Sequence, residues 1–477
     1  MLELKCRVGV VMNRYDVIIV GSGPAGIFTA LELLKDDKNM KILMLDEGRN
    51  IKTRLCPKSK TKECVSCHPC NISNGFGGAG AFSDGKLSLS RDVGGWLNEY
   101  VGNDKLDELI KYVDNIYLEY GGNPEISYNK NFAEQVEYEC SKHGLKFVKC
   151  PVRHLGTEKS QEIMEKMYDF INLNKNTEVI DLAKVCNVEV NDDEYVLEYK
   201  RGKETYRAIS KNVVLAVGRS GSEWLNSLCK KLEIKTNNKQ VDIGVRVELP
   251  RSITDHLTDE LYEFKIYNTS KTSENVVRTF CMNPGGFVSQ ENYDESLAVV
   301  NGHSYHDLKS DLTNFALLVS CEFTSPFNEP VSYGKYIAKL ANMLTGGKIM
   351  VQRLKDLKEG RRSNEGRMRK LPYSPTLSDA VPGDLSFVLP SRITNALLET
   401  FDALENVCPG ISGDSTILYG VEVKFYSSNV VVDSNLMTKY DGLYAIGDGA
   451  GITRGLIQAS ASGVVAARAI LNKTGRR

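Results

Sequence analysis

The residues best suited to chemistry are four cysteines crowded into one short segment. Of the 12 cysteines in the sequence, Cys56, Cys64, Cys67 and Cys70 follow the spacing C-x7-C-x2-C-x2-C. Thiolates at two-residue gaps are typical of iron–sulfur ligation, in which a tight loop directs several sulfurs at one cluster. Four thiolates also suit tetrahedral zinc, and each C-x2-C pair suits a redox dithiol. The spacing leaves three interpretations open: a 4Fe-4S cluster, a zinc site, or free or disulfide-exchanging thiols.

The order of the four cysteines favours the iron–sulfur interpretation. Zinc sites usually use two separated C-x2-C pairs, whereas here three cysteines follow one another at two-residue gaps. The departure from the iron–sulfur pattern is that the fourth cysteine precedes the trio instead of following it. The other eight cysteines are scattered along the chain, as expected for small buried apolar residues.

A second group of residues predicts a dinucleotide site near the start of the chain. Residues 15–20 form an apolar, β-branched run that predicts a buried strand, and G-S-G-P-A-G follows at residues 21–26. Residues 27–35 have helical spacing, and a second predicted strand at residues 41–45 ends at Asp46. Strand, G-x-G-x-x-G turn, helix, strand and terminal acid together are the fingerprint of a dinucleotide-binding βαβ unit.

Each residue type in this fingerprint has a physical task. Gly21 permits the tight turn, Gly23 lets the backbone approach a pyrophosphate, and Gly26 lets helix and strand pack closely. The helix start then offers free N–H groups and a positive dipole end to the phosphates. Asp46 is placed to accept hydrogen bonds from ribose hydroxyls, which favours FAD or NAD over NADP.

Two later segments indicate which dinucleotide is bound. Residues 212–218 (NVVLAVG) predict a strand that ends in Ala-x-Gly, and residues 442–451 (GLYAIGDGAG) predict a strand running into a glycine turn. An apolar, alanine-rich helix is expected at residues 456–471. With these motifs the sequence resembles the two-dinucleotide-binding-domain flavoproteins. The resemblance implies that Gly447 and Asp448 contact the ribityl–phosphate region of FAD, and that the last helix directs its N-terminus at the flavin pyrimidine ring.

A narrower resemblance rests on residues 76–87 (FGGAGAFSDGKL) and 447–455 (GDGAGITRG), supported by residues 242–248 (DIGVRVE) and 278–281 (RTFC). These look like the bacterial family of uncharacterised FAD-dependent, or NAD-utilising, dehydrogenases. The resemblance implies that the loop at residues 77–86 lies against the ribityl chain and isoalloxazine. Arg54 is expected either to reach the pyrophosphate or to remain a solvated arginine.

The expected cofactor-binding residues come from the glycine turn at 21–26, the region around Asp46, the loop at 77–86 and the later strand and glycine motifs. They are Gly21, Gly23, Pro24, Ala25, Gly26, Asp46, Glu47, Arg54, Gly77, Gly78, Ala79, Gly80, Ser83, Asp84, Lys86, Val185, Ala216, Gly218, Gly447, Asp448, Gly455 and Leu456.

The predicted fold is α/β: a glutathione-reductase-like Rossmann FAD-binding domain, discontinuous in sequence, with an inserted α+β domain. Residues 1–233, including a cysteine-rich loop at 54–90, and residues 419–477 are assigned to the FAD-binding domain, and residues 234–418 to the insertion. In this fold class such an insertion packs over the flavin and forms the substrate face.

Candidate catalytic residues come from the insertion. The segment 353–370 carries eight basic residues against three acidic ones. It is interpreted either as a solvated loop or as an anion clamp, with Arg361 and Arg362 holding a substrate carboxylate or a nicotinamide phosphate. Cys281 is a candidate to face the flavin.

Composition narrows the class of protein. Lys and Arg total 60 and Asp and Glu total 61, a net charge of −1 that argues against a nucleic-acid or anionic-membrane binder. No run reaches the roughly 18 apolar residues that span a bilayer, and the N-terminus lacks the features of a signal peptide, so a cytoplasmic protein is expected.

The sequence therefore predicts an FAD-dependent oxidoreductase that transfers a hydride at the flavin to or from a small molecule. No second G-x-G-x-x-G is found, so electrons would come from transiently bound NAD(P)H, from the substrate, or from a redox partner such as ferredoxin. The cysteine site would relay electrons or brace the flavin loop. The alternatives are a non-redox or group-transfer flavoprotein, such as an RNA-modifying enzyme, and a flavoprotein with a structural zinc knot.

Overall fold

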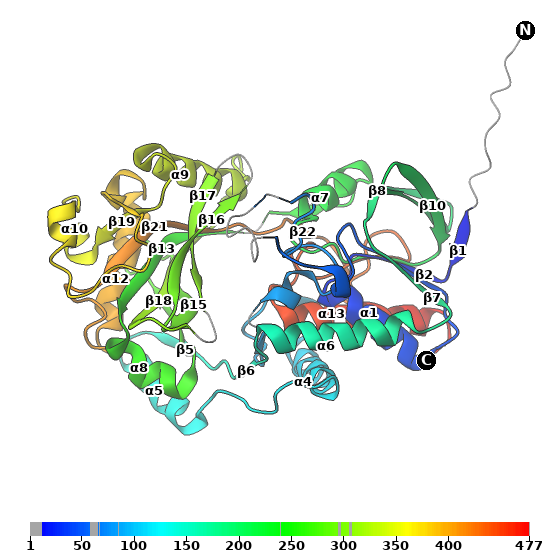
Figure 1. Ribbon diagram of the computed structural model, residues 1–477, viewed down its shortest axis with the longest axis horizontal. Coiled ribbons are helices and arrows are strands. Elements are labelled where there is room, and N and C mark those ends of the chain that lie inside the picture. The colour runs from blue at the N-terminus through cyan, green and yellow to red at the C-terminus, as the bar shows by residue number, and fades with distance from the viewer. Residues whose placement is uncertain are drawn as a thin grey trace, which may run out of the picture. The chain divides into compact units, whose positions relative to one another are not determined.

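The chain divides into two units, each with its own sheets and core. A computed structural model describes residues 12–57, 65, 67–83, 85–238, 240–293, 297–304 and 308–476 (Figure 1). The first unit comprises Met1–Glu125, Arg153–Asn237 and Ser427–Arg477, and the second comprises Ile126–Val152 and Asn238–Tyr426. Within the described part of the chain, no helix is both long and apolar enough to cross a bilayer.

The sequence-based domain boundaries, 233/234 and 418/419, differ from this division in one respect that matters. The segment Ile126–Val152 was assigned to the FAD-binding domain, but it belongs to the second unit. Its strand β5 (Lys146–Val148) pairs with β14 (Lys265–Thr269) at the edge of the large sheet of that unit. A strand of three residues has too little periodicity to be assigned from sequence.

The first unit is built on a five-stranded parallel sheet. Its strand order is β23-β11-β2-β3-β7, and all four pairings are parallel. The inner strands are fully buried on both faces, which explains why they appear as unbroken apolar runs in the sequence. The strands are β2 (Val17–Val20), β3 (Ile42–Leu45), β7 (Thr177–Ile180), β11 (Val213–Leu215) and β23 (Leu443–Ala445).

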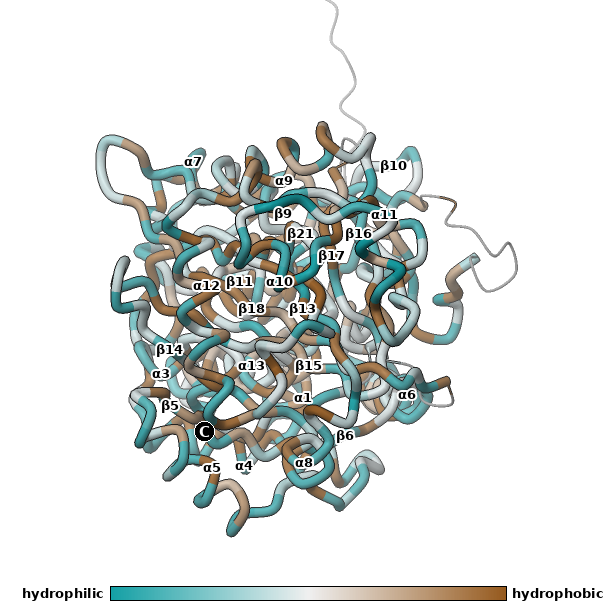
Figure 2. Tube along the Cα trace, turned by 90° about the vertical axis from the view of Figure 1, so that its left-hand side faces the viewer, coloured by the Kyte–Doolittle hydropathy of each residue, from teal (hydrophilic) through white to brown (hydrophobic). Residues whose placement is uncertain are grey.

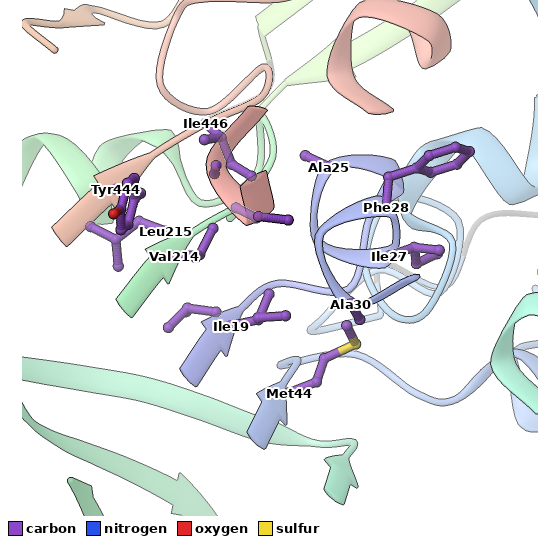
Figure 3. Packing of buried hydrophobic residues seen from close by; sticks show 14 of the residues in the cluster. Ile19, Ala25, Ile27, Phe28, Ala30, Met44, Val214, Leu215, Tyr444 and Ile446 are labelled. Carbon is purple, nitrogen blue, oxygen red and sulfur yellow. The ribbon is translucent and has the colours of Figure 1, made fainter. Parts of the chain in front are cut away.

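Two helices that directly follow sheet strands pack against each other. Helix α1 (Pro24–Asp36) follows β2, and helix α13 (Leu456–Lys473) comes after β23 and its glycine turn. They meet at Gly463, where an added Cβ would lie 2.2 Å from the carbonyl oxygen of Ala25. Figure 3 shows Met44 of β3 lying next to Ala30 of α1, whereas Phe28 of α1 points away from the strands.

A second, four-stranded sheet of the first unit has the order β1-β10-β9-β8, in which β8, β9 and β10 pair antiparallel. Its strands are β1 (Asn13–Tyr15), β8 (Ala183–Asn191), β9 (Glu194–Arg201) and β10 (Glu204–Ser210). The other elements used below are the 3-10 helix η2 (Gly78–Phe82), β4 (Lys86–Ser88), α4 (Asn103–Glu119), α6 (Thr157–Asn172) and α7 (Ser222–Lys231).

The second unit contains an eight-stranded sheet with one apolar and one polar buried face. Along β13 (Val241–Pro250) the odd-numbered residues are aliphatic and face the core, whereas Asp242, Arg246 and Glu248 lie on the other face. All three polar residues are fully buried. In Figure 2 brown, hydrophobic stretches lie among teal, hydrophilic ones near the labels β13 and β18.

The strand order of that sheet is β20-β19-β21-β13-β18-β15-β14-β5, and β16 and β17 form a separate hairpin. The second unit's strands not yet given are β15 (Val276–Pro284), β16 (Phe287–Tyr293), β17 (Leu297–His303), β18 (Leu312–Cys321), β19 (Met350–Arg353), β20 (Val381–Pro382) and β21 (Ile417–Lys424). The helices of eight or more residues are α5 (Lys130–Lys142), α8 (Arg251–Leu261), α9 (Pro330–Thr345) and α12 (Ser391–Leu404).

Candidate functional site

Three adjacent parallel strands of the first unit end at one edge of its sheet. An added Cβ on Gly21, just past β2, would lie 2.3 Å from the carbonyl oxygen of Ala216, just past β11. An added Cβ on Gly447, just past β23, would lie 3.1 Å from the Cβ of Ala25. The structure thus brings these four predicted residues together at the carboxyl edge of the sheet, where open α/β sheets bind their ligands.

The three glycines of the first turn are needed for different reasons: two by the packing of the chain itself, and one only by a ligand. A Cβ on Gly21 would clash as above, and a Cβ on Gly26 would lie 2.0 Å from the carbonyl oxygen of Gly21, so the fold itself needs both glycines. Gly23 has an ordinary φ of −73°, and the nearest atom to its added Cβ is the Cα of Gly78, 3.9 Å away. The chain leaves open space at Gly23, as expected if a ligand approaches the backbone there.

Gly455 repeats this arrangement at the start of α13. Its backbone is extended, with φ 170°, and an added Cβ would meet only the Cα of Gly94, at 3.8 Å. Gly23 and Gly455 are the N-cap residues of α1 and α13, and neither helix has a side chain that caps its N-terminus. Two long helices therefore present first-turn N–H groups without a side-chain cap, and positive dipole ends, beside open backbone.

The predicted flavin loop runs between these two helix starts. An added Cβ on Gly78 would lie 3.2 Å from the Cα of Gly23 and 3.4 Å from the Cδ of Pro24. An added Cβ on Gly80 would lie 2.4 Å from the Cδ2 of Leu456. The loop therefore touches the first residue of each helix, and both first residues are predicted cofactor contacts.

Further predicted residues hold this loop in place or extend from it. The amide of Gly77 donates to the carbonyl oxygen of Ser22 at 2.8 Å, and the hydroxyl of Ser83 donates to the carbonyl oxygen of Gly80 at 2.8 Å. Ala79 is exposed, and Lys86 begins β4. Asp84 lies outside the described residues.

Asp46 ends β3 and braces the first turn. Its Oδ2 atom accepts hydrogen bonds from the amide and the hydroxyl of Ser22, at 2.8 and 2.7 Å, and its Oδ1 atom accepts from the amide of Gly48 at 2.8 Å. A carboxylate has about four acceptor positions, so capacity remains for a ribose hydroxyl. Burial raises the pKa of the neighbouring Glu47.

The start of β8 places Val185 near this acid. The amide of Ala183, the first residue of β8, donates to the carbonyl oxygen of Asp46 at 2.7 Å. Val185 follows two residues later and is buried. Its contact with the cofactor stays a prediction.

Arg54 is buried and holds a loop, so the expectation of a solvated arginine is wrong, whereas its contact with the pyrophosphate stays a prediction. It is one of the largest fully buried side chains, and it donates to the carbonyl oxygens of the loop that leads into η2. Burial lowers the pKa of Arg54 to about 10, although the nearby charge of Asp46 acts in the opposite direction. The acceptors and distances are Asn71 at 3.0 Å, Ile72 at 2.8 Å, Gly75 at 3.3 Å, Phe76 at 2.6 Å and Gly78 at 3.0 Å.

Replacing Arg54 with glutamine is expected to loosen this loop. Several buried carbonyl groups would lose their donor, at about 1–3 kcal/mol for each unsatisfied group. Limited proteolysis should then cut the segment 54–83 faster, and FAD should dissociate faster. Lys52→Gln is the matched control, because Lys52 is half-exposed and pairs with Asp169 on the surface. Equal cleavage of both variants would show that Arg54 does not hold the loop.

Asp448 lies in the turn after β23, and its carboxylate interacts with Thr453 of the same turn and with Arg219. Its Oδ1 atom accepts from the hydroxyl of Thr453 at 2.8 Å, and its Oδ2 atom lies 3.9 Å from Nε of Arg219. Burial raises the pKa of Asp448, while Arg219 and Thr453 oppose the rise. Gly218, which precedes Arg219, contacts the same turn, since an added Cβ on Gly449 would lie 2.3 Å from its carbonyl oxygen.

The sequence analysis missed one segment of the site, residues 91–97. The amide of Arg454 donates to the carbonyl oxygen of Gly94 at 2.7 Å, and its guanidinium stacks on the ring of Trp96 at 3.9 Å. Gln458 of α13 donates to two carbonyls of the segment at 3.2 and 3.0 Å. The G-G-W sequence at 94–96 was the available signal, but nothing local shows that it pairs with residues far along the chain.

The cysteine segment is described only in part. Cys56 and Cys67 are half-buried and Cys70 is exposed, while Cys64 lies outside the described residues. Burial raises the pKa of Cys70, but hydrogen bonds from Ser73 and Ile72 and the charge of Arg54 bring it below its ordinary value. Among the described residues, no group of three or more metal-ligating side chains is found. The four-cysteine site stays a prediction.

The three candidate catalytic residues all belong to the second unit. Cys281 lies in β15 with φ +49°, and its carbonyl oxygen accepts from Nη1 of Arg246 at 2.8 Å. Arg361 lines a basic pocket, whereas Arg362 does not and donates weakly to the carbonyl oxygen of Pro382 at 3.4 Å. The role of Arg361 and Arg362 as one anion clamp stays a prediction.

Comparisons with known families agree with the division into two units. Residues 15–242 match the pyridine nucleotide-disulphide oxidoreductase family, and residues 240–425 match the FAD-dependent protein, C-terminal domain-like family. The protein is thus an FAD-dependent oxidoreductase with a Rossmann-type FAD-binding fold. Each of these two matches is a similarity over less than half of the chain. The open glycines and helix starts described above fit FAD.

Individual proteins with similar sequences or structures share little sequence identity with this chain. An uncharacterised protein of Clostridium beijerinckii is 27% identical over 491 residues, covering 96% of this chain and 80% of the relative. Among solved structures, E. coli quinol fumarate reductase has a TM-score of 0.43 at 12% identity, over 97% of this chain and 71% of that one. A formate oxidase has a TM-score of 0.46 at 12% identity, over 97% and 99% of the two chains. At these values neither structure carries a functional conclusion.

Proposed function

We propose that this oxidoreductase moves a hydride between FAD and a small organic molecule, and that it belongs to the uncharacterised FAD-dependent dehydrogenases. Bound FAD supplies the hydride chemistry, and the protein supplies binding, orientation and electrostatics. The observation that carries the proposal is the pair of open helix starts at Gly23 and Gly455. Both glycines are unstrained and uncrowded, so the chain has kept space at two positively polarised helix ends.

The two helix starts serve different parts of the cofactor in this proposal. The N–H groups at the start of α1 bind the pyrophosphate, and Asp46 accepts from the ribose. The N–H groups at the start of α13 favour negative charge in front of Leu456. The Gly78–Phe82 loop, which touches both starts, orients the group that lies between them.

Anaerobic reduction tests the proposal. The purified protein should contain FAD, and NADH or NADPH should bleach its absorbance in stopped flow. Nicotinamide deuterated at C4 should slow the bleaching, because a C–H bond breaks in hydride transfer. Protein that binds no FAD after reconstitution would overturn the proposal. FAD that stays oxidised with both nucleotides would exclude them as donors and leave the substrate as the hydride source.

The cysteine segment is the second part of the proposal, and the Arg54 contacts favour it. Arg54 bonds to carbonyls at Asn71 and Ile72, next to Cys70, and also at Gly78 of the flavin loop. One buried side chain thus ties the cysteine segment to the loop. We propose that the four cysteines hold an iron–sulfur cluster or zinc, which relays electrons or braces the loop.

Replacing Cys67 and Cys70 with serine together is expected to remove that metal. Iron and zinc analysis of anaerobically purified protein should show at least one bound ion per chain in the wild type and a loss of most of it in the variant, with FAD content retained. Cys186→Ser is the matched control, because Cys186 is an exposed cysteine on β8. Metal-free wild-type protein, or equal metal content in all three proteins, would contradict a metal site.

A further inference from the structure

The second unit carries a basic pocket that the flavin chemistry above does not use. Its volume is about 590 Å³, within the roughly 300–1,000 Å³ typical of small-molecule sites. Four of the lining side chains are cations and one is an acid. The lining residues are Arg353, Lys355, Arg361, Lys370, Pro372, Asp414 and Ser415.

Arg353 is the residue of the pocket that most strongly indicates a bound ligand. It is the last residue of β19, it is only 8% exposed, and its Nε atom is buried without a hydrogen-bond partner among the described residues. Its amide donates to the hydroxyl of Ser363 at 2.9 Å, which fixes the backbone from which the side chain extends. Leaving this buried Nε–H group without an acceptor is costly, and an anion in the pocket would supply one.

Arg361 is oriented toward this site by a buried acid. Its Nε atom donates to Oδ1 of Asp356 at 2.8 Å, and Asp356 also accepts from the hydroxyl of Ser363 at 2.8 Å. Asp356 is fully buried; burial alone would raise its pKa, but Arg361, Ser363 and Arg353 bring the pKa below its ordinary value. The charged carboxylate therefore positions Arg361 and also interacts electrostatically with Arg353.

The remaining cations divide into one that is paired and one that is not. Lys355 pairs with Asp414 at 2.5 Å. Lys370 is exposed and, within the described parts of the chain, makes no ion pair. Among the described residues, Arg353 and Lys370 make no ion pair, and Arg361, which pairs with both Asp356 and Glu359, adds a third donor.

We propose that this pocket binds the phosphate group of a small molecule. Two unpaired cations match the two negative charges of a phosphate monoester, and guanidinium groups match its oxygens through paired N–H donors. The inference goes beyond hydride transfer at the flavin and rests only on residues of the second unit. Binding assays therefore report on it whether or not the flavin turns over.

Calorimetric titration of the full-length holoprotein with inorganic phosphate and with adenosine 2′-monophosphate tests the site, at constant ionic strength in chloride. Lys370→Gln and Arg353→Gln should each weaken binding of the phosphate probes by about tenfold, as for the loss of one charge-assisted contact of about 1.4 kcal/mol. Arg369→Gln is the matched control, because Arg369 is exposed in the same segment but does not line the pocket. The control should bind like the wild type.

The two probes separate the sources of the phosphate. Tighter binding of adenosine 2′-monophosphate than of inorganic phosphate would assign the site to a nucleotide such as NADPH, and the reverse would assign it to a smaller phosphorylated substrate. Lys370→Gln changes an exposed side chain and keeps the test decisive if Arg353→Gln fails to fold. Wild-type protein that binds neither probe, or equal weakening by Lys370→Gln and Arg369→Gln, would overturn the proposal.

Discussion

Replacing Gly23 with alanine is expected to remove most of the bound FAD while leaving the fold intact. The backbone at Gly23 has a φ of −73°, which alanine adopts readily, and the nearest atom to the new methyl group is 3.9 Å away. The chain therefore tolerates the methyl group, and only a ligand against the backbone is displaced. Loss of one or two N–H contacts with the pyrophosphate corresponds to roughly 10- to 100-fold weaker binding.

Gly26→Ala is the matched comparison for Gly23→Ala. Its methyl group would lie 2.0 Å from the carbonyl oxygen of Gly21, so this variant should lose thermal stability as apoprotein. The measurements are the FAD content after gel filtration, the dissociation constant of FAD by fluorescence, and the melting temperature of each apoprotein. If Gly23→Ala binds FAD like the wild type, the pyrophosphate does not lie at the start of α1.

The parts of the fold that the sequence predicts are those with short-range causes. The turn at Gly21, Gly23 and Gly26 is specified within six residues, and Asp46 follows at the distance set by one helix and one strand. The strands β2, β3, β11 and β23 are buried on both faces and are therefore continuous apolar runs, whereas the edge strand β7 is only partly buried. The late glycine turn at Gly447 and the helix after it are recognisable for the same reason.

The parts that the sequence does not predict depend on distant partners. Arg54 looks like a surface arginine until the loop carbonyls that surround it are known. The pairing of Trp96 with Arg454 joins segments more than three hundred residues apart, and no local pattern records it. The basic segment near Arg361 was identified from composition, but Arg353, the buried member of the pocket, is distinguished from its neighbours only by its environment.

The burial of the polar face of β13 is also not predictable from the local sequence. This burial is expected to have a large effect on the free energy of unfolding. Alternating polar residues on a strand usually indicate a solvent-exposed face, yet Arg246 and Glu422 are both fully buried. Arg246 donates twice to Glu422, at 2.8 and 3.0 Å, and once to the carbonyl oxygen of Cys281 at 2.8 Å. Lys424 adds a contact of 2.9 Å to the same carboxylate.

Replacing Arg246 with methionine is expected to lower the free energy of unfolding of the second unit by about 3–5 kcal/mol, because Glu422 loses its bidentate partner while its charge remains buried. Adding Glu422→Leu to this variant should restore part of the loss, since the uncompensated charge is then removed. Urea unfolding followed by circular dichroism measures both changes.

The exposed pair Arg207–Glu198 provides the control for that experiment. Its side chains are 46% and 31% exposed, so Arg207→Met should cost only about 0–1 kcal/mol. The contrast between the two arginines isolates burial as the cause, because both donate to a glutamate across neighbouring strands. If Arg246→Met is as mild as Arg207→Met, water reaches the β13 face and solvates Glu422. If the double variant is no more stable than Arg246→Met, packing rather than charge dominates the loss, and the buried network serves to align β13 with β21 rather than to balance a carboxylate.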